Sequence, residues 1–447
     1  MPAFFLKDGL PVVMPESVLK ACLDDLLGRF PQVRRLVVGF SGGLDSSVLL
    51  HLLRQWQSQH GRKLLAVHVH HGLSPNADAW AAHAKAVCSA WDIPLCLQHV
   101  QVERGASLEA AARTARRSAL VSVLQEGDAL LLAQHREDQA ETVLLRLLRG
   151  SGVTGLAAMR VESVIAAPGG TAWPLWRPLL NVSRASLGCY AAQQALLWIE
   201  DESNRDSRFS RNFLRNDILP ALQTHWPAAA VTLAATARRL QEADELLQEV
   251  AAESAAVCVD ADGKLAAPAL QQVSPARQRL VLRYWLQQQG FRLPDEAVLA
   301  QVAAVAMSRR EDAAPLVMWP GCEVRRYRQH LYAMTPLAVT PSQWSADWDM
   351  RVPLCLPDGR VLHAEGWTMP NPSKTVRFRQ GGERLRGHGL SHDLKKLLQS
   401  VGVPPWERQR LPLVFSGTEL MAVAGTNLRS PAWPSDVLLR IEPASTQ

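Results

Sequence analysis

The 447-residue sequence has few of the features that staple small secreted proteins or anchor proteins in membranes. Its seven cysteines are scattered, odd in number and never form a Cys-x-x-Cys pair, which argues against a disulfide framework and a paired-cysteine metal site. No apolar run approaches the roughly 18 residues that span a bilayer. Lys7 and Asp8 interrupt the apolar N-terminus, so it makes a poor signal peptide. These absences predict a soluble, cytoplasmic protein with reduced thiols.

The length of the chain predicts how many domains it has, and its charge suggests what kind of partner it binds. A chain of 447 residues exceeds what one core usually serves, so two or three domains are expected. The formal net charge is +6 and the pI is about 9.1. A basic balance of this size suggests a polyanionic partner without requiring one.

Short apolar runs alternate with helical patterns between residues 34 and 134. Strand followed by helix, four times over, predicts an α/β fold with a doubly wound parallel sheet. In such sheets ligands bind at the carboxyl ends of the strands. The expected strands are "RLVVGF", "KLLAVHVH", "LCLQHVQV" and "ALLLA", and the helices that follow them lie near 44–56, 77–91, 107–125 and 137–149.

The composition changes twice after this region, which predicts three domains at 1–220, 221–340 and 341–447. The second domain is rich in Ala, Leu, Gln and Arg and should be mostly helical. The third has short strand-like segments and one clear helix, so it should be a small, mainly β domain of α+β type. We expect Ser391 to cap the start of that helix and Gly402 to end it.

The loop after the first expected strand is the strongest chemical signal. Glycine lets a ligand approach the backbone closely, and the first N–H groups of a helix form a natural phosphate site. Asp45 beside a phosphate implies an intervening Mg²⁺. The simpler alternative is a glycine turn capped by Ser41 or Asp45. The loop consists of Ser41, Gly42, Gly43, Leu44, Asp45 and Ser46, and it lacks the lysine of γ-phosphate-transferring loops.

Ser-Gly-Gly-x-Asp-Ser resembles the signature of the ATP pyrophosphatases. The resemblance implies that the loop holds the β and γ phosphates of ATP while an acceptor oxygen attacks the α phosphate. AMP transfer with release of pyrophosphate would follow.

A second polar group follows the fourth expected strand. His135, Asp138 and Glu141 are spaced by three, so the two carboxylates share a helix face with His135 at its ligand end. Two close carboxylates repel unless they bind a cation, here Mg²⁺ or an ammonium group. The alternative is a solvated acidic turn that complements the helix dipole. Upstream, Arg113 and Arg116 could reach a phosphate or these carboxylates.

The order of these elements, with four further segments, resembles the tRNA(Ile)-lysidine synthetase family over most of the chain. That family uses ATP and Mg²⁺ to ligate lysine to the wobble cytidine of an isoleucine tRNA, through an adenylated cytidine. The further segments are "VHVHHGLS" (67–74), "RPLL" (177–180), "IEDESNRDSRFSRNFLRNDILP" (199–220) and "KKLLQSVGVPPWERQRLPLVF" (395–415).

The resemblance implies catalytic or lysine-binding roles for Arg113, Asp138 and Glu141, with His135 beside the substrate. Lysine is mostly protonated at neutral pH, so it needs a carboxylate to bind it and a base or a desolvating pocket to deprotonate it. Gln134 stands where the family often has a first histidine, and Arg117 where it often has a tyrosine. The part of the missing histidine is therefore open.

Two basic clusters are expected to hold the tRNA. Residues 374–410 carry a net charge of +6, equal to that of the whole chain, and include Lys395 and Lys396. The family resemblance implies that the C-terminal domains grip the acceptor stem. A second cluster could guide the anticodon loop, and it consists of Arg205, Arg208, Arg211 and Arg215. Ordinary solvated side chains, or pairing with Asp201, Glu202, Asp206 and Asp217, are the alternatives.

Two other functions are open at this point. A tRNA thiolase on the same fold would need cysteines for sulfur transfer, a cluster or zinc, yet Cys88, Cys96 and Cys189 lie in segments expected to be buried. A non-catalytic RNA-binding protein with a degenerate ATP fold is disfavoured by the intact loop. The sequence also leaves open whether the chain forms a homodimer.

Overall fold

The structure of the protein is a computed structural model that describes residues 15–102, 108–167, 170–308, 315–341, 343–368, 373–387 and 390–442, without the side chains of residues 108–110 and 205. The chain divides into two compact units, Met1–Leu246 and Leu247–Gln447. The predicted domain boundaries at 220 and 340 stay a prediction. Within the described ranges, no helix combines the length and the apolarity that crossing a membrane would need.

In the described part of the first unit, six strands form one sheet in the order β3-β2-β1-β4-β6-β5. All neighbours are parallel except β5, which runs antiparallel to β6. The strands are β1 (Arg35–Gly39), β2 (Lys63–His70), β3 (Leu95–His99), β4 (Asp128–Leu131), β5 (Glu162–Ala166) and β6 (Ala172–Trp176). The larger helices are α1 (Pro15–Arg29), α2 (Leu44–His60), α3 (Ala77–Ala90), α4 (Leu108–Ser122), α5 (Arg136–Leu147), α7 (Arg184–Gln193) and α10 (Ala229–Cys258).

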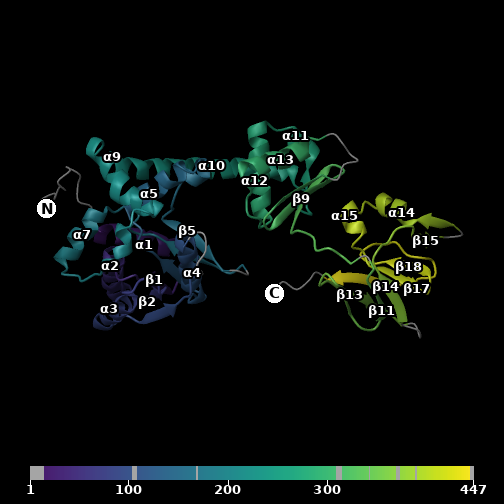
Figure 1. Cartoon of the computed structure of the whole chain (residues 1–447), viewed down its shortest axis with the longest axis horizontal. Helices are drawn as coiled ribbons and strands as arrows, with labels where there is room; N and C mark the ends of the chain where they lie inside the picture. Colours follow the sequence, from purple (N-terminus) through teal and green to yellow (C-terminus); the bar gives the residue numbers. More distant parts are fainter. Residues whose placement is uncertain are drawn as a thin grey trace. The chain divides into compact units, whose positions relative to one another are not determined.

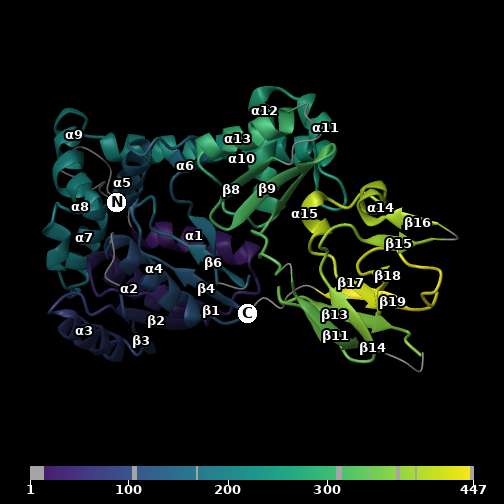
Figure 2. The ribbon, with the colours of Figure 1, turned by 45° about the vertical axis from the view of Figure 1, so that its right-hand side comes forward.

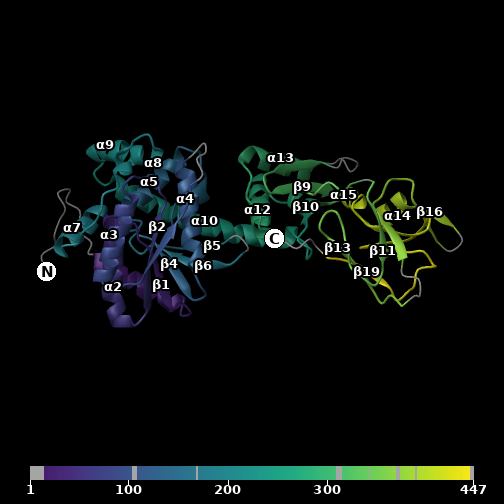
Figure 3. The same cartoon turned by 60° about the horizontal axis from the view of Figure 1, so that its bottom comes forward.

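Helices cover both faces of this sheet, as Figures 1 and 3 show for α2 and α3 on one side and α4 on the other. The alternation of side chains along β1 explains the two layers. Leu36 and Val38 pack with α1, α2 and α7, whereas Val37 packs with Leu120 of α4 on the opposite face. Each buried aliphatic side chain of this kind contributes about 2 kcal/mol. The predicted α/β fold with a doubly wound parallel sheet is confirmed.

The segment after α7 returns to the carboxyl edge of the sheet and supplies part of the site. It contains η1 (Glu202–Arg205), α8 (Ser210–Phe213), the π-helical turn η2 (Leu214–Ile218) and α9 (Leu219–His225). Leu219 of α9 packs against Ala140 of α5, together with Ala230 of α10. These contacts hold the segment against the helix that carries the two predicted carboxylates.

In the second unit, Figure 2 shows strands β8 and β9 beside helices α12 and α13. The described strands there form a sheet in the order β7-β10-β9-β8, which the helical composition of 221–340 did not predict. Trp285 of α12 and Val324 of β9 lie in its core. The elements are β7 (Leu265–Ala266), α11 (Ala267–Gln271), α12 (Pro275–Gln288), α13 (Glu296–Met307), β8 (Leu316–Trp319), β9 (Cys322–Tyr327) and β10 (His330–Met334).

The C-terminal residues are mainly β, as predicted, with two described sheets in the orders β11-β14-β17-β18-β15-β16 and β12-β13-β19. Asp393, rather than Ser391, caps the predicted helix: α14 begins at Leu394, and the carboxylate of Asp393 accepts from the backbone N–H of Lys396. Gly402 follows the helix at φ +81°, as expected. The elements are β11 (Ser345–Asp349), β12 (Leu354–Cys355), β13 (Val361–Glu365), β14 (Ser373–Arg377), β15 (Arg384–Arg386), β16 (Ser391–Asp393), α14 (Leu394–Ser400), α15 (Pro405–Arg408), β17 (Leu413–Ser416), β18 (Glu419–Val423) and β19 (Leu438–Glu442).

Candidate active site

A cavity of about 590 Å³ lies in the first unit at the carboxyl ends of β1, β2 and β4. This is the edge at which a parallel sheet binds its ligands. The predicted loop forms one wall of the cavity and the segment after residue 197 forms another. Polar residues that line it include Ser41, Asp45, Ser46, His71, Gln134, Asp138, Arg184, Asn204, Arg211, Arg215 and Asn216.

Hydrogen bonds between its own residues fix the conformation of the phosphate loop, residues 41–46. Ser46 donates its hydroxyl to the carbonyl of Gly43 (3.0 Å), and its oxygen lies 3.0 Å from the hydroxyl of Ser41. The N-cap of α2 is Gly43, which has no side chain, so the alternative in which Ser41 or Asp45 caps the helix is wrong. The first N–H groups of α2 therefore keep their capacity for an anion.

Gly42 adopts φ +83°, a backbone conformation that other residues rarely take. A Cβ atom at this position would lie 3.0 Å from Cδ1 of Ile199 and 3.3 Å from Cδ2 of His83. The carbonyl of Gly42 accepts a hydrogen bond from the amide of Ile199 (3.0 Å). The loop is thus joined directly to the segment that carries Arg211 and Arg215.

Asp45 has the chemistry expected of a cation ligand. Its Oδ1 is buried and has no hydrogen-bond partner among the described residues. Burial raises the pKa of this carboxyl and Asp138 raises it further, against the opposing effects of His135, Arg184 and Arg215. Mg²⁺ is usually bound by one or two carboxylates together with substrate phosphates. The residues present therefore fit the metal that the ATP-binding loop implies.

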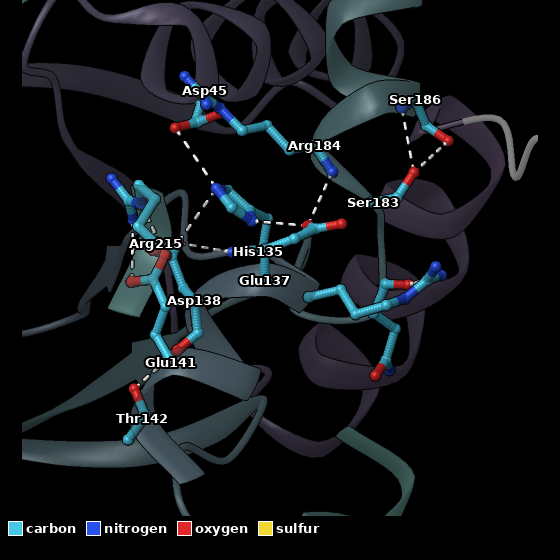
Figure 4. Close-up of polar contacts among 12 residues, drawn as sticks. Asp45, His135, Glu137, Asp138, Glu141, Thr142, Ser183, Arg184, Ser186 and Arg215 are labelled. Carbon is cyan, nitrogen blue, oxygen red and sulfur yellow. Dashed lines mark hydrogen bonds and ion pairs between the residues drawn. The ribbon is translucent and has the colours of Figure 1, made fainter. Parts of the chain in front are cut away.

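His135 lies at the start of α5 among three carboxylates, as Figure 4 shows. Its Nδ1 is 3.0 Å from Glu137, and its Nε2 is 3.7 Å from Asp45 and 3.5 Å from Asp138. Burial lowers the pKa of the imidazole, but the hydrogen bond with Glu137 and the charges of Asp138 and Asp45 outweigh burial and leave the pKa raised. The predicted contact of His135 with substrate stays a prediction. What the structure shows is a buried link between the loop and α5.

Asp138 and Glu141 face two arginines, of which Figure 4 labels Arg215. Arg215 donates from Nη2 to Asp138 (2.7 Å) and from Nε to Glu141 (2.6 Å). Arg211 donates from Nε to Glu141 (2.8 Å) and from Nη2 to Asp138 (3.3 Å). Burial raises the pKa of Asp138, yet His135, Arg211 and Arg215 together hold it below its usual range. The alternative of a solvated acidic turn is wrong, because both carboxylates are buried and paired.

Comparisons with known proteins agree with this geometry. A PP-loop domain model matches residues 15–222, a TilS substrate binding domain model matches 265–332, and a TilS substrate C-terminal domain model matches 375–433. The chain is 45% identical to the tRNA(Ile)-lysidine synthase of Xylella fastidiosa over 406 residues, which cover 89% of this chain and 91% of that protein. The chain belongs to the tRNA(Ile)-lysidine synthase family.

Other tRNA(Ile)-lysidine synthases show the same breadth of similarity. Identity is 45% to the protein of Xanthomonas axonopodis pv. citri, with 87% of this chain and 88% of that protein covered. It is 42% to the protein of Serratia proteamaculans, with 92% and 95% covered. The chain is accordingly a ligase that forms a carbon–nitrogen bond and uses ATP through its PP-loop domain. Membership of this family disfavours the thiolase and the non-catalytic alternatives. The expectation that Cys189 is buried is wrong, because Cys189 is exposed.

The structure brings most of the predicted site residues of the first unit together. Arg113 lies exposed on α4, and it is the neighbouring Arg116 that lines the cavity. Arg211 does so too, but its partners are Asp138 and Glu141 rather than the acidic residues nearby in sequence. The side chain of Arg205 is outside the described atoms. The roles proposed for Arg113 and Arg205 stay predictions.

The sequence pattern predicts no role for Arg184 and places Arg215 only in the basic cluster expected to guide the anticodon loop. Arg215 lies four residues after Arg211 in a helical segment, so both point to the same side. That spacing was a usable signal. Arg184 begins α7, and its backbone N–H donates to Glu137 (2.9 Å). Nothing in the local sequence pointed to that contact.

Fewer basic side chains of residues 374–410 are exposed than the net charge of this segment suggests. Arg408 is buried and bonded to the carbonyl of Val403, and Arg410 is paired with Asp358. Arg379 faces Glu383 at 3.4 Å. The exposed basic residues of 374–410 in the described ranges are Arg384, Arg386, Lys395 and Lys396.

Proposed function

We propose that the chain ligates lysine to the wobble cytidine (position 34) of isoleucine tRNA, giving lysidine, AMP and pyrophosphate. The observation that carries this proposal is that a phosphate loop and an ionised carboxylate, Asp138, line the same cavity. A nucleotide and a cationic substrate can therefore meet in one place. The chain's family supports the same activity.

The first step is transfer of AMP to the base. O2 of cytosine attacks the α phosphorus of ATP, the bond to the β-phosphate oxygen breaks, and pyrophosphate leaves with the electron pair. Residues 41–46 present backbone N–H groups and serine hydroxyls to the β and γ phosphates. Mg²⁺, held by Asp45, would offset the charge of the triphosphate when bound.

The second step is attack by lysine on the activated ring. Its neutral amine forms a bond to C2, the C2–O bond breaks, AMP leaves with the electron pair, and the proton of the nitrogen passes to water. Asp138 faces the cavity, and its low pKa makes it a better binder of an ammonium group than a proton acceptor. We assign it to lysine binding.

Incubation of the full chain with isoleucine tRNA, ATP, Mg²⁺ and labelled lysine tests the proposal. Digestion and mass analysis of the nucleosides should reveal labelled lysidine, and omission of ATP or of Mg²⁺ should abolish it. An arm with methionine tRNA checks substrate choice. Unmodified cytidine in the complete reaction would overturn the proposal.

The four exposed basic residues in and near β15 and α14 are the proposed tRNA surface. Arg384 and Arg386 point to the same face of β15, opposite the buried Leu385. Lys395 and Lys396 lie in the first turn of α14, where Leu394 and Leu398 face the core. Exposed cations with apolar anchors beneath them suit contact with phosphates.

Neutralising Lys395 and Lys396 together should weaken tRNA binding and flatten its salt dependence. The slope of log affinity against log salt concentration should fall by about 1 for each lysine that contacts a phosphate. Filter binding across a salt series measures it. Lys20→Ala with Lys63→Ala removes the same charge from α1 and from the amino end of β2, away from the cavity. An unchanged slope in the Lys395/Lys396 variant would count against this surface.

A further inference from the structure

Glu141 is the predicted catalytic residue whose position does not fit direct contact with substrate. Its side chain is fully buried at 0% exposure, and it is not among the residues that line the cavity. Arg211 and Arg215 lie between it and that space and do line the cavity. A lysine ammonium could reach Glu141 only by displacing both guanidinium groups.

The two arginines present their remaining donors toward the cavity. Each uses Nε and Nη2 for the carboxylates, and no described residue forms a hydrogen bond with Nη1 of either. The side chains of Arg211 and Arg215 are 26% and 27% exposed. A guanidinium fixed on one edge and open on the other suits a phosphate oxygen.

The position of the pair relative to the phosphate loop supports this ligand. A chain of contacts runs from Asp45 through His135 and Asp138 to Arg215. The amide of Ile199 is bonded to Gly42, which fixes the same segment to the loop a second time.

The charge balance shows that Arg211 and Arg215, the arginine clamp, differ from a simple basic patch. Asp138 and Glu141 offset much of the charge of Arg211 and Arg215, so the pair supplies directed N–H donors more than net positive charge. Preorganised donors of this kind favour the more highly charged state that develops as pyrophosphate leaves. Both arginines lie in a helix with a π-helical turn at 214–218, a feature that is frequent at functional sites.

We propose that Arg211 and Arg215 bind phosphate oxygens of ATP, and that Glu141 is a positioning residue that acts only through them. The proposal rests on the use of ATP proposed above and deepens it. It gives the two predicted carboxylates different roles: Asp138 faces the substrate, whereas Glu141 orients the two arginines.

Arg215→Lys and Glu141→Gln test this assignment. Lysine keeps the charge but cannot hold two carboxylates and a phosphate together, and glutamine removes the charge that orients both arginines. We expect the KM for ATP to rise at least about tenfold in each variant. The KM for lysine should rise less, through the bond between Arg215 and Asp138. Arg54→Lys, an exposed arginine on α2, is the matched control and should change neither constant.

Direct binding of ATP and Mg²⁺ to the full chain, measured by calorimetry, keeps the test independent of turnover. Weaker ATP binding by Arg215→Lys than by the wild type supports the assignment of the two arginines to ATP. Failure of the wild type to form lysidine would overturn the proposed function but not this assignment. Glu141 is buried, so Glu141→Gln could fail to fold. Arg215 lines the cavity, and Arg215→Lys therefore provides a second test of the proposal. Unchanged ATP binding in Arg215→Lys, or a rise confined to the KM for lysine, would overturn the clamp.

Discussion

Asp138→Asn is expected to lower the rate of lysidine formation at least about a hundredfold while leaving tRNA affinity near that of the wild type. The substitution preserves size but removes the charge that faces the cavity. Oδ1 accepts from Arg215, and Oδ2 accepts from the backbone N–H of His135 (3.1 Å). An amide NH₂ group must point at one of these donors, so one buried hydrogen bond is lost together with the charge. Single-turnover ligation across a range of lysine concentrations, below and above the wild-type KM, measures the loss.

The matched control is Asp25→Asn, the same chemical change at an exposed carboxylate of α1. It should leave ligation within about twofold of the wild type. Near wild-type turnover in Asp138→Asn would refute both the lysine-binding role and the charge balance described for the site. Circular dichroism of each variant establishes that a slow enzyme is still a folded one.

Gly42→Ala is the second large effect and acts on ATP. A methyl group at φ +83° costs about 1 kcal/mol or more in backbone strain. It would also press on Ile199 at 3.0 Å and His83 at 3.3 Å. The loop or the side chain of Ile199 must shift to relieve this contact. We expect the affinity for ATP to fall at least about tenfold, because the backbone N–H groups no longer converge on the phosphates.

Gly28→Ala serves as the control, since nothing lies within 4 Å of a Cβ atom at that position. Calorimetric titration with ATP and Mg²⁺ compares the two variants. tRNA binding by the Gly42→Ala protein should be retained because the proposed tRNA surface lies in the second unit. Unaltered ATP affinity would mean that the phosphates bind elsewhere.

The parts of the site that sequence could predict are those encoded within a few adjacent residues. The phosphate loop combines a strand end, two glycines and a helix start in contiguous sequence, so its position and its ligand were predictable. The alternation of elements predicted the parallel strands as far as β4, but it did not predict their order in the sheet. Strand β6 was missed because Pro174 argues against a strand inside a sheet, yet it lies between β4 and β5.

The pairing of Arg211 and Arg215 was not predictable in the same way. Asp206 and Asp217 lie only a few residues away and offered nearer partners, and Arg208 does pair with Asp206. The partners of Arg211 are instead some 70 residues earlier in the chain. Tertiary packing decides here, because the buried Glu141 would be costly without compensating charge. Sequence alone carries no measure of that burial.

The bond between Ile199 and Gly42 also sets a length constraint on the chain. The stretch from 199 to 211 is tethered at one end through its backbone and at the other through a guanidinium. Shortening it by even one residue would pull either the glycine loop or the arginine out of register with the nucleotide. The spacing within this stretch, and not only the identity of its end residues, is therefore part of what makes the nucleotide site.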